Sequence, residues 1–165
     1  MPVRIPNHLV FLHHPRTGGT ATTRALLGVG GKKVGERNHD FFQATDAELT
    51  VCTLRDPYDV LASWFIMNPK YSKMSDFLFK YDHSEFRRNH RLFYFAEVSD
   101  IHLLYDDLED CLNTLLNCLG LPNVRIPYLN ATSNKAPYME YYDEESISIV
   151  ETLYSKDLEI YRRLK

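Results

Sequence analysis

The stretch LVFLHHPRTGGTATTRALL, residues 9–27, decides the fold because it contains the pattern of a buried strand, a glycine turn and a helix in immediate succession. The apolar run within residues 8–14 is typical of a strand covered on both faces. Gly18 and Gly19 allow the backbone to turn tightly, and a helix is expected over about residues 20–28. This is the layout of a phosphate-binding loop, but the lysine of the GxxxxGK[ST] pattern is missing, because Thr20 follows the second glycine directly.

Strands alternate with helices along the rest of the chain. Pro57 is expected to open a helix with Asp56 as its N-cap, and the last helix is expected to start at Asp143. Further elements are expected as strands at 32–35, 49–55 and 100–106, irregular helices over 72–95, a helix over 108–120 and a coil over 121–142. The alternation predicts an α/β fold, a three-layer sandwich with a central parallel sheet of the P-loop NTPase-like kind, in one domain over residues 1–165. Ligands of such sheets bind at the carboxyl ends of the strands.

Composition restricts the partners. The net charge of −3 argues against a general nucleic-acid binder. The sequence has no apolar run of the roughly eighteen residues that a membrane span needs, and its first twelve residues lack the apolar core of a signal peptide. Cys52, Cys111 and Cys118 form no CxxC pair. We therefore expect a reduced, cytoplasmic protein with neither nucleic acid nor membrane as its partner.

The glycine turn is the first predicted anion site. Successive N–H groups around Gly18 and Gly19 can point at an anion, and the following helix adds the positive end of its dipole. Arg16 supplies a fixed cation with a fork of donors, and the neighbouring threonines supply hydroxyls. The alternative is an ordinary turn between strand and helix, in which the threonines only cap.

Arg55 and Ser63 form the second predicted anion site. Arg55 ends the strand at 49–55, and Ser63 lies almost two turns into the following helix, so both could close on one anion. The alternative is an arginine paired with Asp56 or Asp59 and a serine in a helix contact. Two anion sites at neighbouring strand ends favour a ligand with two separated anionic groups.

In its motifs the chain resembles the sulfotransferases that use 3′-phosphoadenosine 5′-phosphosulfate (PAPS), with most similarity to the carbohydrate and other membrane-type members. PRTGGT at 15–20 is similar to their 5′-phosphosulfate loop, and LRDPYDVLAS at 54–63 to their 3′-phosphate motif. The stretch at 102–122 resembles the family's RYEDL…LGLP segment, and the tail at 134–164 its terminal lysine loop and helix. One departure is Arg16, because most members have lysine there; arginine occurs in the enzymes that sulfate protein tyrosines.

The resemblance implies a donor, PAPS, a product, 3′-phosphoadenosine 5′-phosphate (PAP), and an assignment of the residues that bind them. Arg55 and Ser63 would hold the 3′-phosphate, Tyr105 would approach the adenine, and Lys135 would cover the cofactor. The 5′-phosphosulfate would be held by Arg16, Thr17, Gly18, Gly19, Thr20 and Ala21. Arg16 would also be catalytic, because it would stabilise the charge on the leaving phosphate.

The acceptor hydroxyl needs a general base, and no metal is required. His39 is the predicted base, because many members place their catalytic histidine between the corresponding strands, and Asp40 or Glu36 could orient it. His14 is the second candidate, Glu36 is a fallback, and a plain surface histidine at position 39 is the structural alternative. His13 and His14 are poor candidates for a metal site, because adjacent residues of a strand point to opposite faces.

The acceptor stays open among saccharide, peptide, lipid and small metabolite, with carbohydrate one possibility. Residues 70–95 combine lysines and arginines with many aromatic rings, which suits a sugar or an acidic acceptor but also a helical cap over the core. In so small a chain the acceptor cleft is shallow and open, or is completed by a second copy in a homo-oligomer. Two other functions stay open: a P-loop kinase of a small molecule, and a non-catalytic module that binds PAP or another nucleotide.

Overall fold

The computed structural model describes residues 1–35, 45–46, 48–81, 91–127, 129 and 136–165. A five-stranded sheet has the order β3-β1-β2-β4-β5. Its strands are β1 (Val3–Ile5), β2 (Leu9–Leu12), β3 (Lys32–Lys33), β4 (Leu49–Leu54) and β5 (Ile101–Leu104). β2, β4 and β5 run parallel, so their carboxyl ends meet at one edge of the sheet.

The expectation of a parallel sheet is wrong for the other two strands. β1 pairs antiparallel with both β2 and β3, which makes the sheet mixed. β1 has only three residues and lies between two prolines, Pro2 and Pro6, so its sequence carries too short a pattern to predict a strand. It turns into β2 through Asn7, which takes a left-handed φ of 64°, a conformation that asparagine tolerates.

Helices cover both faces of the sheet, and the side chains of the strands alternate between them as expected for a period of two. On one face, α1 (Gly19–Leu27) and α6 (Leu108–Cys118) bury a core with Leu9, Phe11, Val51 and Leu103. On the other face, α5 (Leu92–Glu97) and α8 (Ser155–Leu164) bury a core with Val10, Leu12, Cys52 and Leu54.

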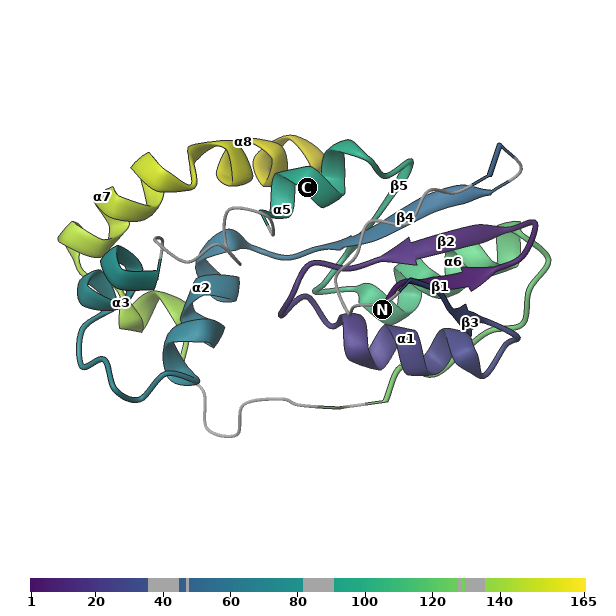
Figure 1. The fold of residues 1–165 in the computed structure, drawn as a ribbon, viewed down its shortest axis with the longest axis horizontal. Coiled ribbons are helices and arrows are strands. Elements are labelled where there is room, and N and C mark those ends of the chain that lie inside the picture. Colours follow the sequence, from purple (N-terminus) through teal and green to yellow (C-terminus); the bar gives the residue numbers. More distant parts are fainter. Residues whose placement is uncertain (36–44, 47, 82–90, 128, 130–135) are drawn as a thin grey trace.

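The remaining helices form a second region beyond the carboxyl ends of the strands (Figure 1). We call it the helical region; it consists of α2 (Pro57–Ile66), α3 (Met74–Tyr81), the 3-10 helix η1 (Tyr138–Tyr141) and α7 (Glu144–Leu153). Its own apolar core includes Leu61, Phe77, Leu78 and Val150. The second anion motif, which starts on β4 and continues in α2, therefore connects the sheet to the helical region.

The helix start at Pro57 is confirmed, with the expected Asp56 at its N-cap. The last helix was expected to start at Asp143; α7 starts one residue later, at Glu144, and Asp143 is its N-cap. The last helix was expected to be continuous, but it breaks at Tyr154, whose ψ of 18° separates α7 from α8. Tyr154 is buried there, so the break brings its ring into the core that α7 and α8 share. Among the residues placed by the structure, no helix combines the length and apolarity that a bilayer crossing demands.

Candidate functional site

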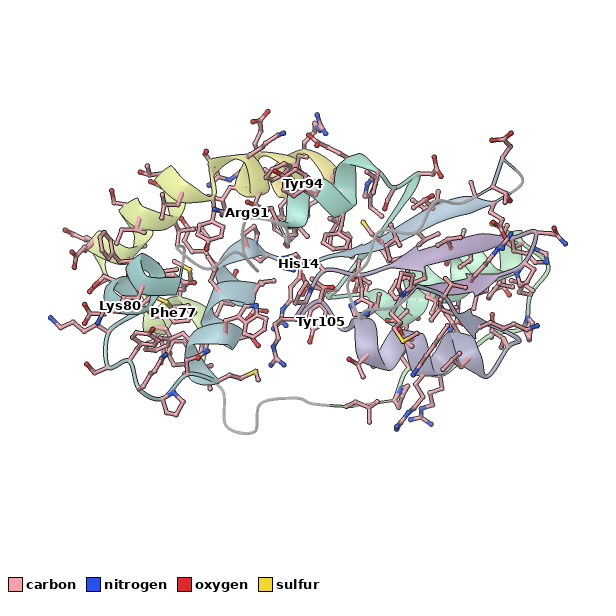
Figure 2. The ribbon with its side chains drawn as sticks, in the orientation of Figure 1. His14, Phe77, Lys80, Arg91, Tyr94 and Tyr105 are labelled. Carbon is pink, nitrogen blue, oxygen red and sulfur yellow. The ribbon has the colours of Figure 1, made fainter. Side chains whose placement is uncertain are left out.

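A cavity of about 640 Å³ opens at the carboxyl ends of β2 and β4, and Trp64 of the helical region contributes to its lining. Four parts of the chain line it: the loop and helix start at 13–21, Arg55 directly after β4, Trp64 of α2, and the β5–α6 junction. Ile126, Pro127 and Leu129, which follow α6, lie beside that junction in the lining. Figure 2 shows Tyr105 of that junction near the middle of the molecule, where the two regions meet. The cavity therefore lies where ligands of parallel sheets bind.

The loop after β2 leads into α1, and the N-terminus of α1 lies at the cavity without a side-chain cap. Gly18 is the N-cap of α1 with a left-handed φ of 79°; within the described part of the chain the helix has no side-chain cap, and its first turn contains no acidic residue. Gly19 and Thr20 begin the helix and line the cavity, and N–H groups in a first turn have no partner inside their own helix. Their position and the helix dipole make this end of the cavity suitable for an anion.

Both glycines are required by their neighbours. A Cβ atom on Gly18 would come within 2.9 Å of Leu108 and 3.2 Å of Tyr105, and a Cβ on Gly19 would overlap the ring of His13. His13 lines the cavity beside them, with its ring stacked on Phe11. The imidazole thus forms a wall against the first residue of α1, a contact that the sequence pattern did not reveal.

Thr17 and Thr20 have different roles in the loop. Thr17 is fully buried; its hydroxyl donates to the carbonyl of His14 and hydrogen-bonds the hydroxyl of Thr53, so it fixes the loop to β4. Thr20 is exposed and Ala21 is buried, and both line the cavity. Five of the six residues predicted to cradle the first anion line the cavity: Arg16, Gly18, Gly19, Thr20 and Ala21. The sixth, Thr17, is buried behind them and anchors the loop through its hydrogen bonds.

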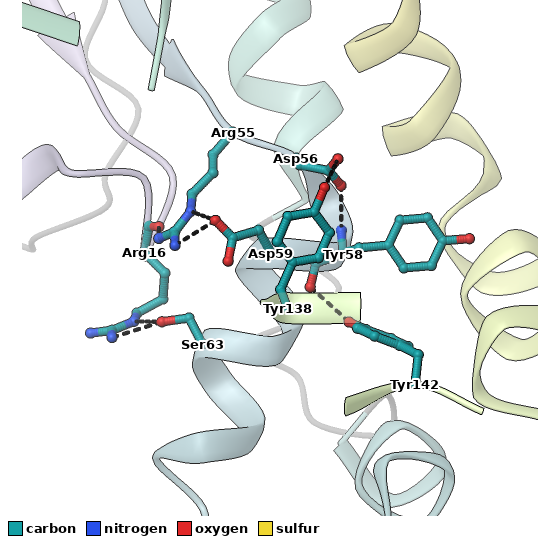
Figure 3. Close-up of polar contacts among 8 residues, drawn as sticks. All are labelled: Arg16, Arg55, Asp56, Tyr58, Asp59, Ser63, Tyr138 and Tyr142. Atoms are coloured by element: carbon teal, nitrogen blue, oxygen red, sulfur yellow. Dashed lines mark hydrogen bonds and ion pairs between the residues drawn. The ribbon is translucent and has the colours of Figure 1, made fainter. Parts of the chain in front are cut away.

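The two predicted anion sites are joined by direct contacts, which Figure 3 shows. Arg55 Nη1 donates to the backbone carbonyl of Arg16 at 2.6 Å, and Arg16 donates through Nε and Nη2 to Ser63 Oγ at 2.9 and 2.8 Å. Ser63, which is buried, therefore lies beneath the guanidinium of Arg16, whereas the sequence had grouped it with Arg55.

Arg55 is also held by a carboxylate and by a ring. Its Nε and Nη2 contact Asp59 Oδ2 at 2.7 Å, and its guanidinium lies 4.1 Å from the centroid of Tyr105. The arginine–aspartate pair considered for this motif is therefore present. A guanidinium has five N–H donors, of which Nε, one on Nη1 and one on Nη2 are engaged in these contacts. Counting the described residues alone, two donors are left over for a ligand in the cavity.

Arg16 has a strained backbone. Its φ of 68° lies in the left-handed region, which costs a residue with a Cβ about 1–2 kcal/mol. The contacts to Arg55 and Ser63 hold both ends of the residue in this conformation. Strain of this kind persists only where the surroundings impose it, and it is common at functional sites.

The start of α2 is tied to η1 by hydrogen bonds that the sequence did not predict. One oxygen of Asp56 accepts from the N–H of Tyr58 and the other from the hydroxyl of Tyr138 at 2.9 Å, while Tyr142 donates to the carbonyl of Tyr58 (Figure 3). Burial first, and then the nearby carboxylate of Asp56, raise the pKa of Tyr138 and of Tyr142 above the ordinary range. Both phenols therefore act as donors and not as bases.

Of the candidate general bases, one lies in the core and the others belong to segments outside the described residues. His14 is buried and its ring meets Phe95 of α5 edge-on, so it faces the core on the far side of the strand from His13. His39, Glu36, Asp40 and Lys135 lie outside the described residues, and their predicted roles stay predictions. His102 bonds the carbonyl of Ala96, which is a structural contact.

Acidic and apolar groups complete the wall opposite α2. Asp106 and Glu109 line the cavity with Leu108, and Glu109 accepts from the N–H of Ile126, which fixes the segment after α6 beside the cavity. Among the described residues, no group of three or more His, Cys, Asp or Glu side chains could hold a metal ion.

Comparison of the chain with protein-family models, with characterised proteins and with solved structures finds no match. What this site does must therefore be inferred from its residues and their geometry.

Proposed function

We propose that this protein is a sulfotransferase that moves a sulfuryl group from PAPS to an acceptor hydroxyl, with β2, its loop and α1 acting as the phosphate-binding unit of a P-loop-type three-layer fold. One observation supports this most: two arginines in direct contact and an uncapped helix N-terminus share one cavity. A cavity of about 640 Å³ is within the range for cofactor sites, roughly 300–1,000 Å³.

The donor would lie across the two strand ends. The N–H groups at the start of α1 would hold the 5′-phosphosulfate, and the two remaining donors of Arg55 would hold the 3′-phosphate. Ser63 would act on the donor through Arg16, whose guanidinium it orients. The adenine would lie near Tyr105 and Leu108, which line the wall on the α6 side.

In the reaction, the acceptor oxygen forms a bond to sulfur while the bond from sulfur to the bridging phosphate oxygen breaks. PAP leaves with the electron pair of that bond, and the proton of the acceptor hydroxyl goes to a general base, for which His39 is the candidate. Charge grows on the bridging oxygen, as in phosphoryl transfer. Arg16 and the N–H groups of α1 would stabilise that charge, and one such preorganised donor contributes about 3–4 kcal/mol.

The two alternative functions predict different ligands or activities. A kinase would bind ATP with magnesium, but the loop lacks the lysine that grips the terminal phosphates of ATP. A non-catalytic module would bind PAP and transfer nothing, so the transfer assay distinguishes it from the enzyme. The 3′-phosphate is the group that PAP has and ADP lacks, so Arg55 is the residue that would tell the two ligands apart.

Calorimetry with PAP and with ADP tests the proposal, followed by transfer of radiolabelled sulfate from PAPS to a set of hydroxyl acceptors. We expect PAP to bind at least tenfold tighter than ADP, since charged hydrogen bonds contribute about 1.5–3 kcal/mol each. Arg16→Ala should lower transfer about a hundredfold, whereas Arg24→Ala, an exposed position at the far end of α1, should not. His39→Ala should spare PAP binding and reduce transfer. Equal affinity for PAP and ADP, or tight binding of magnesium–ATP, would contradict the proposal.

A further inference from the structure

We infer that Arg55 has a second role: paired with Asp59, it positions Arg16 for the transfer step, whether or not the donor carries a 3′-phosphate. Asp59 would be a positioning residue, because it acts on the reaction only through Arg55. The inference rests on the proposed sulfuryl transfer, and it makes the second anion motif part of the catalytic machinery of the first.

The backbone of Arg16 needs support from its surroundings. Arg16 and Asn7 are the two residues other than glycine that have a positive φ in the described part of the chain. Asparagine tolerates this conformation because its short polar side chain can hydrogen-bond locally, whereas the long side chain of arginine has no such local bond. An arginine with a φ of 68° therefore persists only where other groups hold it.

Arg55 holds the peptide group that follows this strained residue. Its Nη1 atom donates to the carbonyl of Arg16 at 2.6 Å (Figure 3), and hydrogen bonds from a charged donor are among the stronger ones in proteins. The next residue, Thr17, is fixed by the bonds of its hydroxyl to the carbonyl of His14 and to the hydroxyl of Thr53. The peptide group between Arg16 and Thr17 is thus held on one side by Arg55 and on the other by Thr17.

Arg55 is itself held by contacts within the protein. Its Nε and Nη2 atoms lie 2.7 Å from Asp59 Oδ2, and its guanidinium lies 4.1 Å from the centroid of the Tyr105 ring. The side chains of the ion pair are only 11% and 14% exposed, so solvent ions screen the pair little. Asp59 belongs to the first turn of α2, whose start is fixed by the N-cap Asp56. Arg55 therefore presents Nη1 to Arg16 without the help of a ligand.

The carboxylate of Asp59 affects the two roles of Arg55 in opposite ways. It occupies two of the guanidinium donors, and its negative charge repels a phosphate nearby, so it weakens Arg55 as an anion grip. The same carboxylate fixes the orientation of the guanidinium, so that one donor stays directed at the carbonyl of Arg16. The Asp59–Arg55 pair is therefore unfavourable for binding of a 3′-phosphate but favourable for positioning of Arg16.

Arg16 is the residue through which this support reaches the reaction. Its side chain starts from the held backbone, and its guanidinium bonds Ser63 and lines the cavity. A preorganised cation stabilises charge that develops in the transition state, and a displacement of about 1 Å can lower a rate about a hundredfold. Loss of the Asp59–Arg55 pair should therefore lower kcat more than it lowers the affinity for a nucleotide.

Amide hydrogen exchange and steady-state kinetics test the inference together. Without ligand, exchange over residues 15–18 should be about tenfold faster or more in Asp59→Ala, because the bond from Arg55 is no longer held in place. At saturating PAPS, kcat should fall about tenfold or more in Asp59→Ala and less in Asp59→Asn, whose amide oxygen can still accept from Arg55. ADP affinity in calorimetry should stay within about threefold in both variants, because Arg16 acts on charge of the transition state. Asp76→Ala, at an exposed acidic position in the first turn of α3, is the matched control and should change none of these quantities.

Adenosine 5′-phosphosulfate (APS), which is PAPS without the 3′-phosphate, separates the two roles of Arg55. The acceptor oxygen again bonds to sulfur while the bond from sulfur to the bridging oxygen breaks. Adenosine 5′-phosphate leaves with that electron pair, and the acceptor proton goes to the general base. With APS as donor, Arg55→Ala should still lower kcat about tenfold or more, although no contact to a 3′-phosphate is lost. If the wild-type protein does not turn over APS, kcat of Asp59→Ala at saturating PAPS decides.

The inference is wrong if Asp59→Ala leaves either kcat at saturating PAPS or exchange over residues 15–18 unchanged. Tighter binding of PAP by Asp59→Ala at an unchanged kcat would show that Asp59 only competes with the ligand for Arg55. Neither result affects the proposed function. Failure of the proposed function differs, because the wild-type protein would then neither prefer PAP over ADP nor transfer sulfate. Should Asp59→Ala unfold, Asp59→Asn decides in the same measurements, with a smaller fall in kcat expected.

Discussion

The two helices that begin at neighbouring strand ends, α1 after β2 and α2 after β4, start in opposite ways. α1 has a glycine in the left-handed region at its N-cap, with neither a side-chain cap nor an acidic residue in its first turn. α2 has Asp56 at its N-cap, Pro57 at its first position and Asp59 in its first turn. The first turn of α1 is therefore without a side-chain cap, whereas in α2 Asp56 caps the N–H of Tyr58 and the two carboxylates also hold Tyr138 and Arg55.

Under the proposed function, this difference gives one edge of the sheet two kinds of anion grip. An uncapped helix start offers N–H groups and a dipole, which bind an anion without a charged side chain. At the start of α2 the carboxylate of Asp56 takes the N–H of Tyr58, and its negative charge opposes a second anion, so an anion grip there depends on a cation that precedes the helix. Arg55 has this place at the end of β4, and its contact with the carbonyl of Arg16 joins the two grips into one site.

The largest expected effect is that of Gly19→Ala, which fills the open start of α1. The added methyl group would overlap the ring of His13, and overpacking of this kind costs about 1–3 kcal/mol of unfolding free energy. Because the loop must shift, the N–H groups at the start of α1 would no longer point at the ligand. PAP affinity should therefore fall about a hundredfold or more. Urea denaturation and calorimetry measure the two quantities.

A double variant tests whether His13 is the cause. His13→Ala removes the ring that the methyl group would meet, so the pair His13→Ala with Gly19→Ala should be more stable than the sum of the single effects predicts, by roughly 0.5–3 kcal/mol. Additive effects, or a Gly19→Ala protein with unchanged stability and affinity, would show that the wall against α1 is not where the structure places it.

The next effect is that of Arg55→Ala, which removes the cation at the capped helix. One or two charge-assisted hydrogen bonds of about 1.5–3 kcal/mol each are lost, so PAP affinity should fall about 10–100-fold while ADP affinity changes little. Arg55→Lys is the informative partner variant: it keeps the charge but loses the fork, and it should recover only part of the affinity. An equal loss for PAP and ADP would mean that Arg55 does not recognise the 3′-phosphate.

Most of the fold could be predicted from local signals. The strands at 49–55 and 100–106, the proline start of α2 and the aspartate before α7 each have a pattern within ten residues, and each is present as β4, β5, α2 and α7. β1 and the break at Tyr154 could not be predicted. The strand character of β1 depends on pairing with β2 and β3, and the break depends on burial of the Tyr154 ring, and neither has a local pattern.

The location of the candidate site in the fold could be predicted from the sequence, but the contacts among its residues could not. Glycines before a helix and an arginine after a strand predicted which strand ends line the cavity. The partner of Ser63 was missed because residues 16 and 63 meet only through the crossover from β2 to β4. Trp64 could not be predicted as a cavity residue, since helical spacing cannot distinguish a side chain that packs in a core from one at the wall of a cavity.

A smaller effect on binding is expected from Asp56→Ala, which removes the cap of α2. Loss of an N-cap costs about 1 kcal/mol and loss of the hydrogen bond from Tyr138 about as much again, so unfolding free energy should fall by roughly 2 kcal/mol. PAP affinity should stay within about threefold, because the cap serves the helix and not the ligand. Tyr138→Phe removes only the hydroxyl and should cost about half as much stability. A loss of PAP affinity as large as that of Arg55→Ala would contradict the division of roles between Asp56 and Arg55.

The smallest effect on binding is expected from a substitution of Glu48. This residue lies at the amino ends of β2 and β4, which are opposite to the strand ends at the cavity. Its buried carboxylate accepts from Arg4 at 2.6 Å, from the backbone N–H of Asn7, and from the N–H and hydroxyl of Thr45. These bonds, that of Arg4 first, lower the pKa of Glu48 from 4.5 to about 2. Since the folded pKa lies below the unfolded one, the stabilisation by this group is complete above pH 4.5 and is lost as the pH falls from 4.5 towards 2.

Urea denaturation across that pH range should therefore show a decline in wild-type stability that is shallower in Glu48→Gln, because the amide does not titrate. At neutral pH the same variant should bind PAP with unchanged affinity, since Glu48 lies at the ends of β2 and β4 away from the cavity. An equally steep decline in Glu48→Gln would assign the acid sensitivity to other carboxylates. A loss of PAP affinity in that variant would mean that the two ends of these strands are coupled, so that the sheet does not hold the α1 and α2 starts independently of its far edge.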